Sequence, residues 1–175
     1  MPESIASPDM PPPTPLQRGI ELVSNIAIAI AAAALLGLVV VQGWQVIARY
    51  VLNDSPSWTE PVTLLLLSTA MSLAAAAGVH TKRHFGFYLL ASSLGAKAQR
   101  VLATIPPLVI MAIGATIAWW GWVLLIDGLD IPAAGADLPQ SINYLPLSVG
   151  GGLMVLFAVN QLIEALRTPT TEGAL

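Results

Sequence analysis

Cysteine is absent from this chain of 175 residues. Disulfide bonds, thiolate nucleophiles and cysteine-ligated metals are therefore excluded. Charged side chains are scarce as well, at 10% of the residues, whereas soluble domains average about 25%. The net charge is −3 and the few basic residues form no patch, which argues against a nucleic-acid partner. This composition is not that of an ordinary soluble domain.

Four long apolar runs account for the missing charge, at roughly residues 20–48, 58–79, 105–126 and 142–166. Each is long enough to cross a hydrocarbon core of roughly 30 Å as a helix rising 1.5 Å per residue. Only helices or closed barrels satisfy their backbone inside a bilayer. A soluble bundle would need polar helix faces, which the run "IAIAIAAAALLGLVVV" lacks. The sequence therefore predicts an all-α integral membrane domain with four transmembrane helices over residues 20–166.

The two chain ends differ from this domain. Residues 1–19 hold six of the fourteen prolines and predict a disordered or extended tail, either an inert leader or a recognition segment. Residues 167–175 form a second short tail. The first apolar run exceeds the 7–15 residues of a signal-peptide core, so we interpret it as a retained span.

The basic residues indicate how the spans are oriented. With four spans, one side carries six of the seven: Arg18, Lys82, Arg83, Lys97, Arg100 and Arg167. Only Arg49 falls on the other side. The positive-inside rule then predicts that both termini are cytoplasmic. The tryptophans agree, since all lie near the outer ends of their spans, as interfacial anchors do: Trp44, Trp58, Trp119, Trp120 and Trp122.

The connection between the second and third runs carries a helical pattern. Its apolar residues recur on one helix face: Phe87, Leu90, Ala91, Leu94 and Ala98. This spacing predicts a short amphipathic helix at about residues 84–99, lying in the cytoplasmic interface. Thr104 would then cap the third span and place Pro106 and Pro107 in its first turn.

The sequence offers little for catalysis or for a cofactor. A metal or haem site in a bundle needs several inward His or carboxylates. Only His80 and His84 are present, beside Lys82 and Arg83, which would repel a cation. A Ser-His-Asp triad is also excluded by the predicted topology, because the histidines are inside and the loop aspartates outside. We expect no cofactor, no metal and no enzymatic activity.

A transporter acting alone usually places ionisable residues near the midplane of the bilayer. None falls at mid-span here; Glu21, the nearest, lies at the inner end of the first span. Small residues line the spans instead, at Ser68, Ser72, Gly114, Ala118 and residues 150–152. Such residues let helices approach closely. They serve either packing within this bundle or docking to a second membrane protein, and both interpretations stay open.

Three motifs, in this order and spacing, resemble a known family. They are "RYVLNDSPSWTE", "HTKRHFGFYLL" and "LPQSINYLPLSVGGGLM". Together with four spans and cytoplasmic termini, they resemble the small membrane subunit, of the Q or DctQ type, of tripartite ATP-independent periplasmic (TRAP) transporters. The chain departs from this pattern at Pro61, where the family often has an acid, and at Phe87 and Tyr88, where it often has an aspartate.

The resemblance implies a bacterial inner-membrane transport system in three parts. A periplasmic binding protein would deliver an organic acid, and a large membrane subunit would move it with sodium and without ATP. The small subunit would brace the large one. Two other hypotheses remain: a self-sufficient oligomeric transporter, which needs an essential embedded carboxylate such as Glu21, or a membrane anchor of another complex.

The segment from Arg49 to Pro61 supplies most candidate interface residues. Asn53 to Pro56 predicts a reversal, and Ser57 with Glu60 predicts a capping box on the second span. Arg49 would pair with Glu60 or with an acid of a partner subunit. The residues expected to serve a partner interface or a structural role are Arg49, Asn53, Trp58, Glu60 and His84.

Overall fold

The computed structural model describes residues 15–54, 56–81, 96–136 and 138–167. Its long helices are α1 (Pro15–Tyr50), α2 (Thr59–His80), α4 (Ala96–Asp127) and α5 (Leu145–Arg167), and a 3-10 helix, η1 (Gln140–Asn143), precedes α5. All four long helices are long and apolar enough to cross a membrane. The prediction of an all-helical, four-span architecture is confirmed to this extent.

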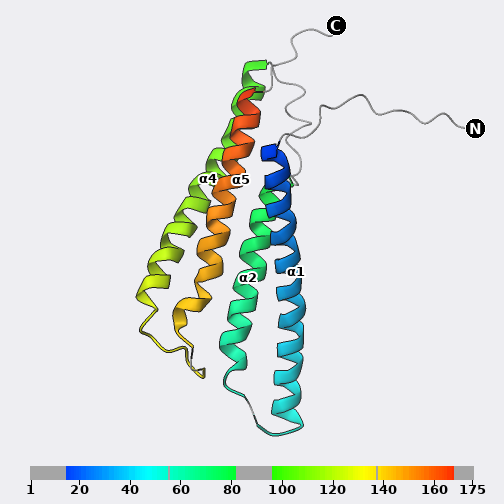
Figure 1. Cartoon of the computed structure of the whole chain (residues 1–175), viewed down its shortest axis with the longest axis vertical. Coiled ribbons are helices and arrows are strands. Elements are labelled where there is room, and N and C mark those ends of the chain that lie inside the picture. Colours follow the sequence, from blue (N-terminus) through cyan, green and yellow to red (C-terminus); the bar gives the residue numbers. More distant parts are fainter. Residues whose placement is uncertain (1–14, 55, 82–95, 137, 168–175) are drawn as a thin grey trace, which may run out of the picture.

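The four helices stand side by side and alternate in direction (Figure 1). The start of α1 and the end of α5 lie at one end of the molecule, called here the terminal end. The α1–α2 turn and the α4–α5 connection lie at the opposite end, called the turn end. All five tryptophans belong to segments near the turn end and are 45–67% exposed, as side chains at a membrane interface are.

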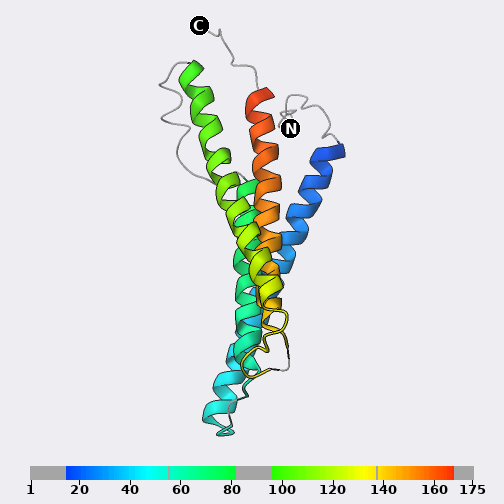
Figure 2. The ribbon, with the colours of Figure 1, turned by 90° about the vertical axis from the view of Figure 1, so that its left-hand side faces the viewer.

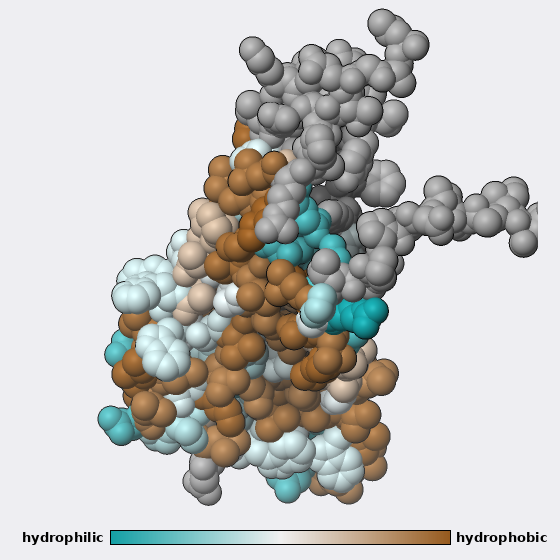
Figure 3. Space-filling view, turned by 45° about the horizontal axis from the view of Figure 1, so that its top comes forward, coloured by the Kyte–Doolittle hydropathy of each residue, from teal (hydrophilic) through white to brown (hydrophobic). Residues whose placement is uncertain are grey.

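The helices form a row in the order α1, α2, α5, α4. The main contacts join α1 to α2, α2 to α5 and α5 to α4. Figure 2 shows α1, α4 and α5 diverging toward the terminal end. Because the two outer helices do not close on each other, both faces of the row stay open along much of their length. Apolar side chains cover most of the helical surface visible in Figure 3.

Small residues set the close approaches within this row. A Cβ on Gly150 would lie 2.6 Å from the Cβ of Ser72 on α2, and one on Gly151 would lie 2.6 Å from the backbone nitrogen of Ala118 on α4. Consecutive helix residues point about 100° apart, so Gly150 can face α2 while Gly151 faces α4. Gly114 packs against Met154 in the same α4–α5 contact. Ser72, Gly114, Ala118, Gly150 and Gly151, whose role the sequence left open, are thus used for packing inside the bundle, whereas Gly152 faces away from the other helices.

One buried cluster joins all four helices near the terminal half. Its buried members are Ile20, Ala76, Val79, Phe157 and Ala158, with Val23, Ile110, Met111, Leu153 and Met154 packed around them. On α1 the buried residues recur at three- and four-residue spacing, so that one narrow face meets α2. Most other apolar residues of α1 are exposed, as in a helix that faces lipid or another membrane protein.

The helix boundaries differ from the predicted ones in two places. α1 begins at Pro15, inside the predicted tail, because proline fits the first helical position, where its missing N–H is not needed. α4 is continuous from Ala96, so Thr104 lies inside the helix and the predicted cap is wrong, although the apolar stretch begins at Thr104, close to the predicted start of the span at residue 105. Pro106 and Pro107 lie within α4, beside the start of its apolar stretch at Thr104. The carbonyls that lose a helix partner precede this apolar stretch, where water can replace the missing N–H groups.

The predicted interfacial helix at residues 84–99 falls largely outside the described residues. Its last four residues belong to α4. His84, Phe87 and Tyr88 lie outside the described part of the chain, as do the tails at residues 1–14 and 168–175. The interfacial helix and the cytoplasmic placement of the termini therefore stay predictions.

Candidate functional site

The α1–α2 turn is built around a left-handed residue. Asn53 has φ 52°, a conformation that asparagine adopts more readily than most residues. The backbone N–H of Asp54 then reaches back to the carbonyl of Ala48 at 3.1 Å, which closes the end of α1. The chain reverses here as the sequence predicted, and Asn53 has a structural role.

The predicted capping box at the start of α2 is wrong. The residue preceding α2 is Trp58, and no side chain caps this end. The hydroxyl of Thr59 is fully buried and donates to the carbonyl of Pro56 at 2.8 Å. Ser57, expected to cap α2, donates instead to the carbonyl of Gly135 at 2.9 Å, in the distant α4–α5 connection. The Ser57 hydroxyl thus donates to a distant loop, and no N–H of the described first turn of α2 donates to its oxygen.

The α4–α5 connection is folded back on itself as a small hairpin-like loop. The N–H of Ala133 donates to the carbonyl of Leu138 at 2.7 Å, and that of Gln140 donates to Ile131 at 2.8 Å. At the tip, Gly135 has φ 85°, and a Cβ there would lie 2.5 Å from the carbonyl oxygen of Ser57. This contact therefore requires glycine. The sequence carried no signal that these two loops meet.

Arg49 and Glu60 are both exposed at the turn end. No ion pair joins them within the described residues, so the predicted pairing inside the chain is not formed. The other predicted role of Arg49, pairing with an acid on another subunit, stays a prediction. Trp58 is 45% exposed on the same turn. The structure thus brings four predicted residues to one end, and the fifth, His84, lies outside the described residues.

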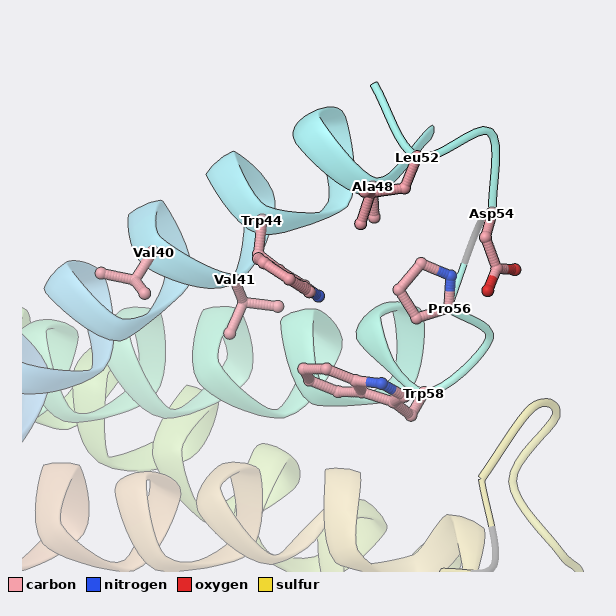
Figure 4. Close-up of a pocket in the computed structure, with 8 residues that line it drawn as sticks. All are labelled: Val40, Val41, Trp44, Ala48, Leu52, Asp54, Pro56 and Trp58. Atoms are coloured by element: carbon pink, nitrogen blue, oxygen red, sulfur yellow. The ribbon is translucent and has the colours of Figure 1, made fainter. Parts of the chain in front are cut away.

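A groove of about 560 Å³ runs beside this turn, between the last part of α1 and the start of α2 (Figure 4). It is lined by Val40, Val41, Trp44, Ala48, Leu52, Asp54, Pro56 and Trp58. The indole rings of Trp44 and Trp58 approach each other across it in Figure 4, and Asp54 lies beyond them on the turn. Asp54 is the one charged side chain of this lining. The sequence predicts an interfacial position for both tryptophans but carries no signal that they line the same groove.

At the terminal end, polar side chains join α2 to α5. The ring of His80 lies 5.2 Å from that of Phe157, and the side-chain amide of Gln161 donates to the carbonyl of Val79. Asn160 donates to Glu164 at 3.1 Å on the same helix. In the described part of the chain, no group of three or more His, Cys, Asp or Glu could hold a metal ion. His80 therefore packs as part of a helix contact.

Comparison with known families decides what this bundle belongs to. The family model described as tripartite ATP-independent periplasmic transporters, DctQ component, matches residues 38–168, well over half of the chain. The chain belongs to the DctQ family. The match runs from the middle of α1 to the end of α5, and so contains the turn-end groove and both connected loops. The comparison with curated proteins returned no match.

Membership of the DctQ family makes this chain the small membrane component of a TRAP transporter. The resemblance carried by the three motifs is confirmed. Together with the four apolar helices, membership indicates a multi-pass inner-membrane protein. The family is a transporter component and not an enzyme family.

Proposed function

We propose that this DctQ chain is a scaffold that braces the large TRAP membrane subunit. The large subunit would carry the substrate and sodium sites and take up an organic acid without ATP, after delivery by a periplasmic binding protein. The small subunit would hold a fixed position in the bilayer beside it. Both termini would be cytoplasmic, with the turn end facing the periplasm.

Two features together carry this proposal. The helices of the row are in close contact, and the middle of each apolar span carries no charged side chain. α5 contacts α2 and α4 through glycines so close that a Cβ would meet backbone or Cβ atoms. Rigid contacts of this kind suit an element that resists movement. The acidic residues Glu21, Glu60 and Glu164 all lie near helix ends. Translocation of an organic anion would then depend on charged or broken-helix sites supplied by the large subunit.

The open geometry of the row supports a membrane partner as well. Large apolar residues are exposed on all four helices, among them Leu36 at 71%, Met71 at 66%, Ile113 at 49% and Leu156 at 48%. A self-contained four-helix transporter would be expected to close around its pathway. Glu21, which that alternative requires as an embedded carboxylate, is exposed at the terminal end of α1.

Co-purification and uptake test the proposal together. A tagged chain extracted in mild detergent should bring one large multi-span protein with it, and deletion of the chain should abolish organic-acid uptake. Re-expression of the chain should restore uptake. Purification as a lone, stable species, with uptake intact after deletion, would contradict the scaffold function.

A further inference from the structure

We propose that the groove between Trp44 and Trp58 binds one phospholipid with a primary-amine head group, such as phosphatidylethanolamine. The lipid chain would lie along α1 against Val40 and Val41. The ammonium group would reach Asp54 at the turn. This site does not depend on the proposed scaffold function.

The length of the groove is close to the hydrocarbon thickness of one leaflet. Its α1 wall extends from Val40 to Ala48, about 12 Å at 1.5 Å per residue. One half of a hydrocarbon core of roughly 30 Å is about 15 Å, so the wall spans most of one leaflet. The wall runs along the helix axis, as a lipid chain does in the bilayer. The apolar end of the groove thus falls in the hydrocarbon and the Asp54 end at the head groups.

The lining of the groove suits an amphiphile. Seven of its eight residues are uncharged, and the eighth is Asp54 on the turn. A lipid with an apolar chain and a cationic head group carries its groups in the same order along the groove.

The polar groups at the open end select the head group. The carboxylate of Asp54 is exposed and can accept hydrogen bonds from a primary ammonium group. Neither the Trp44 nor the Trp58 indole N–H donates to an acceptor within the described part of the chain, which leaves both for lipid ester or phosphate oxygens. Arg49 does not line the groove. Viewed down the axis of α1, with 100° between consecutive residues, Trp44 lies about 60° to one side of Val41. Arg49 lies about 80° to the other side, away from the groove. The groove therefore combines an apolar wall with one acceptor for a cation.

Native mass spectrometry of the detergent-purified complex tests this site. The complex would be stripped of lipid and offered equal amounts of phosphatidylethanolamine, phosphatidylcholine and phosphatidylglycerol. We expect one retained lipid per small subunit, with phosphatidylethanolamine preferred over phosphatidylcholine by about two- to tenfold, the factor of one hydrogen bond. Phosphatidylcholine is the informative competitor, because its quaternary ammonium carries a charge but donates no N–H bond.

Three variants locate the lipid. Val40→Trp should fill the groove and abolish retention, whereas Val39→Trp, at the adjacent exposed position outside the groove, should retain the lipid. Asp54→Leu, which removes both the charge and the acceptor, should keep the lipid but lose the preference for the primary amine. Equal retention by the two tryptophan variants, or equal binding of the choline and ethanolamine lipids to the unmodified chain, would overturn the proposal.

A photocrosslinker distinguishes lipid from protein in the same groove. A phosphatidylethanolamine with a photoactivatable acyl chain leaves the groove of the unmodified complex unfilled by any label. Irradiation should attach this lipid to the α1 segment that contains Val40 and Val41, and Val40→Trp should lose the crosslink. Absence of the crosslink from this segment in the complex, with the lipid bound elsewhere, would show that the lipid proposal is wrong.

Discussion

The hydroxyl of Ser57 donates to the carbonyl of Gly135 at 2.9 Å and so joins the two connections at the turn end. These residues are 78 positions apart in the sequence. The contact fixes the α1–α2 pair relative to the α4–α5 pair at this end of the row. It therefore belongs to the tertiary structure as much as the helix contacts do.

Replacement of Ser57 tests this link. Ser57→Ala removes the donor and should lower the free energy of unfolding by about 0.5–1.5 kcal/mol, the usual contribution of one such hydrogen bond. Thermal unfolding of the purified chain in detergent measures the change. Ser57→Thr keeps the hydroxyl and should retain most of the stability. Equal loss in both variants would show that the side-chain volume, and not the hydrogen bond, matters at this position.

The glycines of α5 provide a second test with an internal control. Gly151→Ala would place a methyl group 2.6 Å from the backbone nitrogen of Ala118, and backbone atoms cannot move aside cheaply. We expect a destabilisation of about 1–3 kcal/mol, as for other overpacked contacts. A Cβ on Gly152 would meet no atom within 4 Å, so Gly152→Ala should be neutral or stabilise the helix by about 0.5–1 kcal/mol. Similar unfolding curves for the two variants would contradict the packing described for α5 and α4.

Arg49 tests the partner-facing role of the turn. Because no acid within the described residues pairs with it, we predict an acidic partner on the large subunit. Arg49→Ala should then weaken co-purification of that subunit by about fivefold, equivalent to about 1 kcal/mol. Arg18→Ala, at the terminal end, is the matched control and should leave association unchanged. Unchanged association and uptake in Arg49→Ala would reduce the turn to a purely structural element.

The absence of cysteine makes the orientation directly measurable. If the turn end faces the periplasm, Ala134→Cys in the exposed α4–α5 connection should react with a membrane-impermeant maleimide on cells with a permeabilised outer membrane. Leu16→Cys, at the start of α1, should react only after the inner membrane is opened. The reverse pattern of labelling would show that the termini are periplasmic.

Much of the membrane fold was predictable because it depends on local composition. A run of about 20 apolar residues must form a helix inside a bilayer, whatever surrounds it. The four spans and the interfacial tryptophans follow from this constraint, and the motifs around Arg49, His84 and residues 150–152 were enough to indicate the DctQ family. The turn at Asn53 was also local, since asparagine tolerates a positive φ.

Other features were decided only in three dimensions. The sequence could not say whether Ser72, Gly150 and Gly151 serve this chain or a partner, because small residues allow both; the order of helices in the row assigns them to contacts within the chain. Ser57 was predicted to cap α2, yet its hydroxyl donates to Gly135 in a loop 78 residues away, a contact that no local motif indicates. The Trp44–Trp58 groove likewise requires two helices to meet. Hydropathy determines which segments enter the membrane, whereas contacts between distant segments determine which of their side chains remain available for lipid or protein.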